Sequence, residues 1–209
     1  PISQPAEDSG LRNLTQSFLG LLILLSIGSA LAPAFANDAL VYHLAVPKAF
    51  LQAGGLVHLP NNIYSLFPQQ IEMLYLFALA LGSDSLAQLT GLGINFLLLF
   101  GLWQYSKQKI GVSYAWLTPL IFISTPTFFS LAASADVDLQ VAAYVFLAFY
   151  SWENGYTRKQ TNWFLLMTLF AGAAVATQIT TVIVLPLAFL GLSIHGRTHK
   201  NTSQTAGQC

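Results

Sequence analysis

The chain has 209 residues, of which 55% are hydrophobic and only 8% are charged. An ordinary soluble domain is about 25% charged, so this composition argues against a water-soluble core and indicates a membrane protein. Eight basic and eight acidic residues give a net charge of zero, which argues against nucleic acid as a partner. The single cysteine, Cys209, excludes an intrachain disulfide and a cysteine-based metal site.

The chain begins with a polar segment, residues 1–13, which we predict to be cytoplasmic. Because the first residue is Pro1 rather than methionine, we interpret the sequence as part of a longer protein. The apolar run that follows is too long for the core of a signal peptide, so we expect an uncleaved first membrane helix.

A membrane-spanning helix requires roughly 20 apolar residues. Four uncharged runs approach or exceed that length, the last of them being short. These predicted spans are residues 14–36, 85–106, 113–135 and 139–152.

Residues 160–194 form a fifth uncharged run, too long for one ordinary span and somewhat short for two. Its middle, residues 177–181, is polar, and we predict two short helices that meet there at a tight turn; one long tilted helix is the alternative. Residues 195–209 form a polar tail that we expect to be disordered. The predicted fold class is all-α, a polytopic membrane helical bundle of about six transmembrane helices.

The topology with two spans over residues 160–194 and the topology with one can be compared by the positions of the basic residues, because these are enriched on the cytoplasmic side of a membrane. With the N-terminus inside and six spans, seven basic residues fall inside and only Lys48 falls outside; a single span over residues 160–194 would make the split five to three. The six-span topology places five acidic residues on the outer face, namely Asp38, Glu72, Asp84, Asp136 and Asp138.

The outer loop, residues 37–84, is predicted to be ordered. Residues 39–53 can form an amphipathic helix that bends at Pro47 and stops at Gly54. Residues 72–81 can form a second apolar helix that is too short to span. Both helices are expected to lie in or near the membrane interface.

Three outer acids are candidates for chemistry. Asp38 directly follows the first helix, where it can act as a general base if it is held near an acceptor proton; a helix cap or a solvated interfacial acid is the alternative. Asp136 and Asp138 flank one residue before the fourth predicted span. Such a pair can share a divalent cation, which makes these residues metal candidates, although acids also favour the first turn of a helix.

Other outer side chains have weaker indications. Lys48 can contact a phosphate or extend to lipid headgroups. His43 lies five residues after Asp38, about half a turn away on a helix, and is expected to be structural or interfacial. Glu72 opens a helix and is expected to cap it. Three tyrosines are interpreted as interfacial aromatics or as the lining of a groove for sugar or lipid, namely Tyr42, Tyr64 and Tyr75.

Together these segments resemble the first outer loop of polytopic GT-C glycosyltransferases, closest to the bacterial branch similar to protein O-mannosyltransferases and lipid A aminoarabinose transferases. The short turn with Asp136 and Asp138 resembles the second acidic site of that class. The resemblance covers about residues 11–194. The pieces that carry it read Asp38-x-x-x-Tyr42-His43-Leu44-x-x-Pro47-Lys48, Tyr64-Ser-x-Phe-Pro68 and Glu72-Met-Leu-Tyr75.

The resemblance implies a hexosyl- or pentosyltransferase in a bacterial inner membrane, with its active face outward. The donor would be a sugar on a polyisoprenyl phosphate, and the acceptor a lipid, glycan or protein. Asp38 would activate the acceptor for inverting attack, Lys48 would neutralise the departing phosphate, and Asp136 or Asp138 would orient the site or hold a divalent metal. Substrate contacts are expected from His43, Tyr42, Tyr64 and Glu72.

Two departures from the class stand out. Gln178 occupies a position where relatives often carry a lysine. Full-length members also have more spans and often an outer domain, so this portion alone is expected to be inactive. The alternatives to an enzyme are a transporter, which would place ionisable residues near the membrane midplane, and a non-catalytic membrane scaffold.

Overall fold

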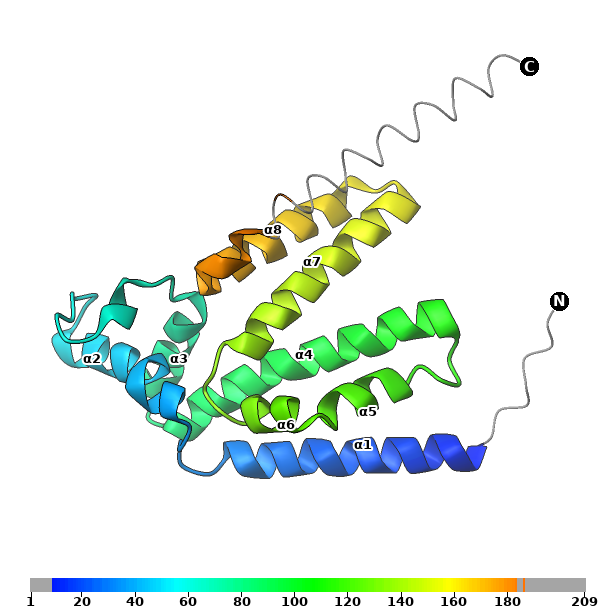
Figure 1. Ribbon diagram of the computed structural model, residues 1–209, viewed down its shortest axis with the longest axis horizontal. Helices are drawn as coiled ribbons and strands as arrows, with labels where there is room; N and C mark the ends of the chain where they lie inside the picture. Colours follow the sequence, from blue (N-terminus) through cyan, green and yellow to red (C-terminus); the bar gives the residue numbers. More distant parts are fainter. Residues whose placement is uncertain (1–8, 184–185, 187–209) are drawn as a thin grey trace, which may run out of the picture.

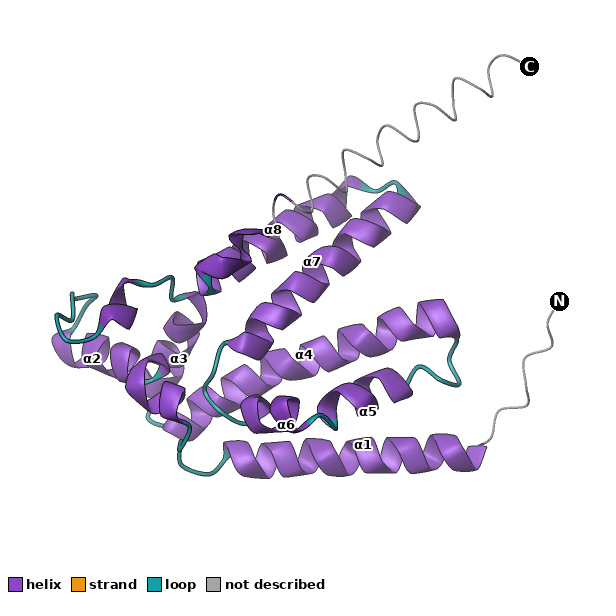
Figure 2. Cartoon of the chain, viewed as in Figure 1, coloured by secondary structure: helices purple, strands orange, loops and turns teal. Residues whose placement is uncertain are grey.

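The computed structural model describes residues 9–183 and residue 186, and within them all regular structure is helical (Figures 1 and 2). This confirms the predicted all-α class. The elements are α1 (Ser9–Ala30), the π-helical turn η1 (Ala39–His43), α2 (Ala45–Ala53), the 3-10 turn η2 (Ile63–Leu66), α3 (Gln70–Ala80), α4 (Asp84–Ile110), α5 (Leu117–Ile123), α6 (Pro126–Ala132), α7 (Asp138–Arg158), α8 (Thr161–Thr177) and the 3-10 turn η3 (Ile179–Ile183).

Among the described helices, α1 and α4 are long and apolar enough to cross a membrane, with 22 and 27 residues. They match two of the predicted spans. Ser83 caps α4 by accepting a hydrogen bond from the amide of Leu86 at 3.0 Å. Asp84 lies in its first turn and Lys107 and Lys109 in its last, so charge complements the helix dipole at both ends.

The third predicted span, residues 113–135, is not one helix. It forms two seven-residue helices, α5 and α6, each only about 10 Å long. Pro126 cannot donate a backbone hydrogen bond, and the Thr125 side chain caps the helix that restarts after the break. The prediction of one continuous helix here is wrong, and the described residues do not confirm six transmembrane helices.

The fourth predicted span is helical and longer than expected, because α7 continues to Arg158. α8 packs beside it, and the pair diverges from α4 in Figure 1. Gly155 permits this contact, since an added Cβ would lie 3.1 Å from the Cβ of Trp163.

The fifth uncharged run, residues 160–194, is interrupted at its polar middle, residues 177–181, as predicted. α8 ends at Thr177, Gln178 has extended backbone angles, and η3 follows. This break is inconsistent with one continuous tilted helix. Most of the second half of the run, like the polar tail, lies outside the described residues.

The outer loop gathers at one end of the bundle, where η1, α2 and α3 lie together (Figure 1). The predicted bend occurs at Leu44 rather than at Pro47, because residues 39–43 form a π-helical turn closed by the bond from the Leu44 amide to the carbonyl of Ala39. Pro47 has no N–H to donate to the carbonyl of His43, so an unbroken α-helix cannot pass this point. Gly54 ends α2 in a left-handed conformation, φ 68°, as expected.

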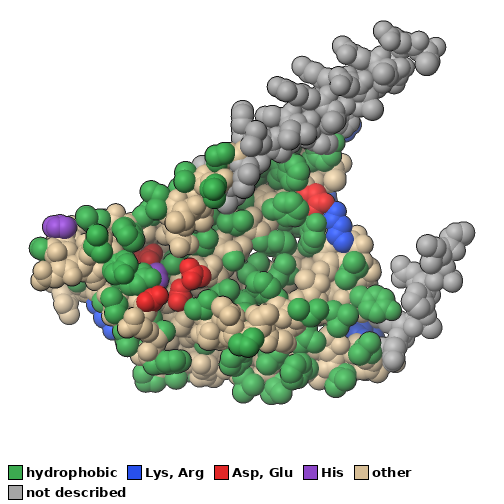
Figure 3. Space-filling model, in the orientation of Figure 1, with side chains coloured by type: hydrophobic (Ala, Val, Ile, Leu, Met, Phe, Trp, Pro, Cys, Tyr) green, Lys and Arg blue, Asp and Glu red, His purple; other side chains and the backbone are tan. Residues whose placement is uncertain are grey.

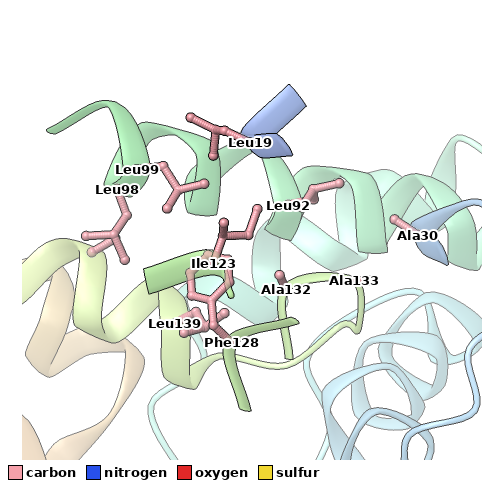
Figure 4. Close-up of a cluster of buried hydrophobic side chains, with 11 residues drawn as sticks. Leu19, Ala30, Leu92, Leu98, Leu99, Ile123, Phe128, Ala132, Ala133 and Leu139 are labelled. Carbon is pink, nitrogen blue, oxygen red and sulfur yellow. The ribbon is translucent and has the colours of Figure 1, made fainter. Parts of the chain in front are cut away.

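Two groups of buried side chains hold these parts together. One joins α1, α4, α5, α6 and α7 in the bundle and is drawn in Figure 4. The other joins the outer loop to the turn before α7 and is rich in alanine, which allows close approach of the backbones. Its members are Ala39, Leu44, Ile71, Tyr75, Ala78, Ala87, Ala135 and Val137.

Polar contacts also fix the end of α1. Gln88 of α4, which is fully buried, donates to the carbonyl oxygens of Ala30 at 3.1 Å and Ala32 at 2.7 Å. Ser85 donates to the carbonyl of Leu31 at 3.0 Å. Carbonyl groups at the end of a helix find no N–H donor within that helix, so α4 supplies the donors here.

Candidate active site

The packing of the outer loop against the turn before α7 brings acidic side chains from distant parts of the sequence to one face. Figure 3 shows them grouped with a histidine at the outer-loop end. Asp136 is 8% exposed, and its Oδ1 accepts from the backbone amides of Val137 at 2.7 Å and Asp138 at 3.3 Å. The carboxylate therefore shapes the start of α7, as an acid in a first turn would.

The backbone of this turn is held by a side chain that we interpreted as interfacial. Tyr75 is fully buried, and its hydroxyl donates to the carbonyl oxygen of Asp136 at 2.5 Å. Burial and the nearby charges of Glu72 and Asp136 raise the pKa of Tyr75 well above its ordinary value, so it remains a donor. Because Tyr75 is fully buried, it is neither an interfacial aromatic nor the lining of a groove, so both interpretations of this residue are wrong.

His43 and Glu72 meet in the interior. Nδ1 of His43 is 2.7 Å from Oε1 of Glu72, and Nε2 is 3.9 Å from Oδ1 of Asp136. The wider π-helical turn brings His43 closer to the face of Asp38 than α-helical spacing predicts. Glu72 lies in the first turn of α3 as expected, but its carboxylate binds His43 rather than capping the helix.

A pocket of about 280 Å³ opens beside these residues. Aromatic side chains and the outer carboxylates form one part of its wall, and the polar segment after α8 forms another. Its polar and aromatic lining comprises Tyr42, His43, Tyr64, Phe67, Gln69, Glu72, Asp138, Thr177, Gln178 and Thr180.

Two tyrosines form a stacked pair in this wall. The rings of Tyr42 and Tyr64 are 4.1 Å apart at an interplanar angle of 15°. Asn62 holds the pair together, because its side chain donates to the carbonyl of Val41 at 3.0 Å and accepts from the amide of Tyr64 at 3.1 Å. Asparagine favours turns because its side chain binds the backbone two residues on, as Asn62 does with Tyr64, but its contact with Val41, 21 residues away, has no local signal in the sequence.

Asp38 is exposed at the start of η1, and its side chain makes no capping hydrogen bond. Its charge nevertheless reaches the pocket. Burial is the main cause that raises the pKa of Tyr42, and the charge of Asp38 is the next. Asp38 also contributes to the raised pKa of Asp138, so the three groups share one electrostatic environment.

Lys48 does not join this group. Its Nζ is 2.9 and 3.0 Å from the two carboxylate oxygens of Asp84 at the start of α4, and it does not line the pocket. Its side chain is 42% exposed. Among the described lining residues the pocket has no lysine or arginine, and Gln178 stands in its wall.

The described residues do not fit a metal site made by the protein alone. No group of three or more histidine, cysteine or carboxylate side chains in residues 9–183 is arranged to hold an ion. Oδ1 of Asp136 already accepts two backbone amides in a buried position. We therefore assign no step of the chemistry to a metal at Asp136 and Asp138.

Comparison with known proteins gives a match to a protein family. The family model described as dolichyl-phosphate-mannose-protein mannosyltransferase matches residues 94–206, more than half of the chain. The matched region includes Asp136, Asp138 and Gln178 but begins after the outer loop. No curated protein and no solved structure gave a match. The chain therefore belongs to the dolichyl-phosphate-mannose-protein mannosyltransferase family, of the GT-C type of membrane glycosyltransferase.

Proposed function

We propose that the chain moves a sugar from a polyisoprenyl-phosphate donor to an acceptor on the non-cytoplasmic side of the membrane, with inversion at the anomeric carbon. The observation that supports this most is the pocket walled by aromatic side chains that the carboxylates of Glu72 and Asp138 line, with the charge of Asp38 acting on Asp138. The family match makes the protein a glycosyltransferase; the donor, the face and the stereochemistry are our proposal.

The proposed topology has a cytoplasmic segment 1–13, a membrane domain 14–194 with the outer catalytic loop 37–84, and a polar tail 195–209. It is supported by the ends of α4, because Asp84 begins the helix beside the outer loop and Lys107 and Lys109 end it on the other side. Basic residues favour the cytoplasmic side, and the pocket lies at the opposite end of the bundle. We therefore propose that the pocket is on the outer face of a bacterial inner membrane.

In the proposed reaction Asp38 is the general base. It accepts the proton of an acceptor hydroxyl as that oxygen bonds to the anomeric carbon, and the bond from this carbon to the carrier phosphate breaks in line. The carrier phosphate leaves with the bonding electron pair. The exposed position of Asp38 supports this role, since an acceptor can approach it from water.

Other lining residues are proposed to bind and orient the substrates. Oε2 of Glu72 is buried and has no hydrogen-bond partner among the described groups, so it is suited to accept from a sugar hydroxyl. The stacked Tyr42 and Tyr64 offer an aromatic wall for the sugar. Asp138, which also lines the pocket, is proposed to orient the acceptor or sugar.

Lys48 is proposed to receive the departing phosphate, although it lies outside the pocket lining. Its partly exposed side chain can exchange Asp84 for a phosphate, since an exposed ion pair contributes little free energy. This step requires the side chain to move toward the pocket when donor binds.

A transporter is disfavoured by the place of the charges. The break between α5 and α6 resembles the discontinuous helices that transporters use, but no ionisable side chain lies in residues 117–132. Asp38, Glu72, Asp84, Asp136 and Asp138 lie at the outer-loop end of the bundle instead.

The proposal is tested by assaying the full-length protein with radiolabelled polyprenyl-phosphate mannose. Asp38→Asn and Asp138→Asn, made separately, should reduce transfer, and Asp38→Asn should do so by about 100-fold or more, the contribution typical of a general base. Glu153→Gln, at the other end of the bundle, is the control. Unchanged transfer in both aspartate variants would refute the assigned roles.

The proposed face is tested separately by labelling engineered cysteines. Asn61→Cys in the outer loop and Gln108→Cys near the end of α4 are both at exposed positions. They should react with an impermeant maleimide from opposite sides of the membrane. Reaction of both from the same side contradicts the topology.

A further inference from the structure

His43 lies at the centre of a buried contact between three segments that are distant in the sequence. It belongs to η1, Glu72 belongs to α3, and Asp136 belongs to the turn before α7. The side chains of His43, Glu72 and Asp136 are only 3%, 7% and 11% exposed. Because an ionised carboxylate can only accept, Nδ1 of His43 donates to Glu72.

This geometry leaves the imidazole poorly placed to bind a substrate. One ring nitrogen is bonded to Glu72 and the other faces Asp136 at 3.9 Å. The ring of Tyr42 lies against it, with centroids 4.0 Å apart. His43 contributes an edge to the pocket wall. Its Nδ1 is hydrogen-bonded to Glu72, and its Nε2 faces Asp136 at a distance that is too long for a hydrogen bond but within the range of an ion pair when the ring is protonated.

The oxygen of Asp136 that faces His43 also organises the start of α7. Oδ1 accepts the amides of Val137 and Asp138, and Asp138 lines the pocket two residues further on. If the Asp136 carboxylate moved, the backbone amides that it binds would lose their acceptor, and the backbone that carries Asp138 would move with it.

We infer that His43 is a positioning residue, which joins Glu72 to Asp136 and so keeps residues 134–138 in the arrangement that holds Asp138 in the pocket wall. The inference rests on the proposed function only for the importance of Asp138 in sugar transfer. The structural link itself is independent of which sugar or acceptor the enzyme uses.

The link is tested by chemical labelling of the turn in the full-length protein, in native membranes and in a background without other cysteines. Ser134 is 3% exposed, so the thiol of Ser134→Cys should react with N-ethylmaleimide only when the turn opens. Replacing His43 should accelerate this reaction by at least about tenfold. Ser106→Cys, buried at 6% exposure in α4, should keep its rate and serves as the control for general unfolding.

Two conservative variants separate the two contacts of His43. The amide nitrogen of His43→Asn falls near the position of Nδ1 and keeps the bond to Glu72, whereas that of His43→Gln falls near Nε2 and keeps the contact with Asp136. We expect fast labelling in His43→Asn and a rate closer to the parent in His43→Gln. Parental rates in both variants would overturn the inference.

Transfer from radiolabelled polyprenyl-phosphate mannose supplies the second measurement. Since His43 is not proposed to touch donor, His43→Asn should lower kcat by about tenfold and leave KM for the donor within about threefold. A rise in KM with unchanged kcat would instead make His43 a substrate contact and overturn the inference. If the parent enzyme transfers no mannose, mannose is not the sugar it uses, while the labelling rates still decide the structural link.

Discussion

The two ends of the bundle both carry charged side chains, but they hold them in different ways. At the end opposite the outer loop, Lys109 pairs with Glu153, while Lys107 and Arg158 lie over the rings of Trp103 and Trp163 at 5.3 and 5.4 Å. At the outer-loop end, carboxylates and an imidazole meet in the interior. Figure 3 shows the acidic group on one side and the acid–base pair on the other.

The difference indicates that one end of the bundle anchors the protein at the membrane interface, whereas the outer-loop end carries the functional site. Cations beside aromatic rings at a helix end are what a membrane interface favours, and they need no particular partner. Burial of Asp136, Glu72 and His43 is unfavourable unless their contacts are specific. Groups maintained in such an environment are typical of functional sites, so the outer-loop end is where substitutions should have large effects.

The largest effect is expected from Asp136→Ala. It removes the acceptor of two backbone amides at the start of α7 and leaves the buried amide of Val137 unpaired, which should lower the free energy of unfolding by about 1–3 kcal/mol. Transfer activity should fall with it. Thermal unfolding in detergent and the mannose assay measure both, and Asp136→Asn, which keeps an oxygen, should retain most of the stability. A fully stable alanine variant would contradict the role of this carboxylate.

The next largest effect is expected from Gly91→Ala in α4, directly below the acidic end. Its Cβ would lie 2.7 Å from the hydroxyl of Tyr75 and 2.9 Å from Nε2 of Gln140, and such overpacking typically costs about 1–3 kcal/mol. Gly93→Ala is a matched control, because no atom lies within 4 Å of the added methyl. If both variants unfold at the same temperature, the close packing under Asp136 is not as described. Combining Gly91→Ala with Tyr75→Phe should cost less than the sum of the two changes, since the hydroxyl is one of the crowded atoms.

A smaller effect is expected from pH. Partial burial raises the pKa of Asp138 above its ordinary 3.8, the charge of Asp136 raises it further, His43 lowers it and Asp38 raises it. Because the folded pKa exceeds the unfolded one, ionisation of Asp138 weakens folding as pH rises above 3.8. Asp138→Asn should therefore be slightly more stable than the parent near pH 7, and this advantage should shrink toward about pH 4. Thermal unfolding across that range checks the sign, and an advantage that grows on acidification would contradict it.

The smallest effect is expected at the opposite end. Glu153→Gln breaks the exposed pair with Lys109 and should leave both unfolding temperature and mannose transfer unchanged, because exposed ion pairs contribute little. A loss of activity in this variant would show that charges at both ends matter and would remove the contrast between them.

The sequence predicted those features that depend on composition and on local breakers. Long apolar runs located α1 and α4, Gly54 marked the end of α2, and the polar residues 177–181 marked the end of α8. The division of residues 113–135 was missed because the apolar pattern hides Pro126, although Thr125 followed by proline is a helix-start signal.

The site was predicted as a set of residue types but not as a set of contacts. The pairing of Lys48 with Asp84, 36 residues away, depends on how α2 and the start of α4 both pack against α3, which no local pattern encodes. The contact of His43 with Glu72 was hidden by the π-helical turn, because helical spacing assumes 3.6 residues per turn. The burial of Tyr75 follows from the long-range packing of α3 on the turn before α7.

The attachment of the end of α1 to Gln88 has a consequence for the proposed base. Only residues 31–37 separate that helix from Asp38, a tether of at most about 25 Å when fully extended. The position of the Asp38 carboxylate therefore depends on α4 through the side-chain amide of Gln88, which lies inside the bundle and lines no part of the pocket. The reach of Asp38 toward an acceptor is set by this anchor as much as by its own surroundings, so a substitution deep in the bundle can misplace the base without altering any group that substrate touches.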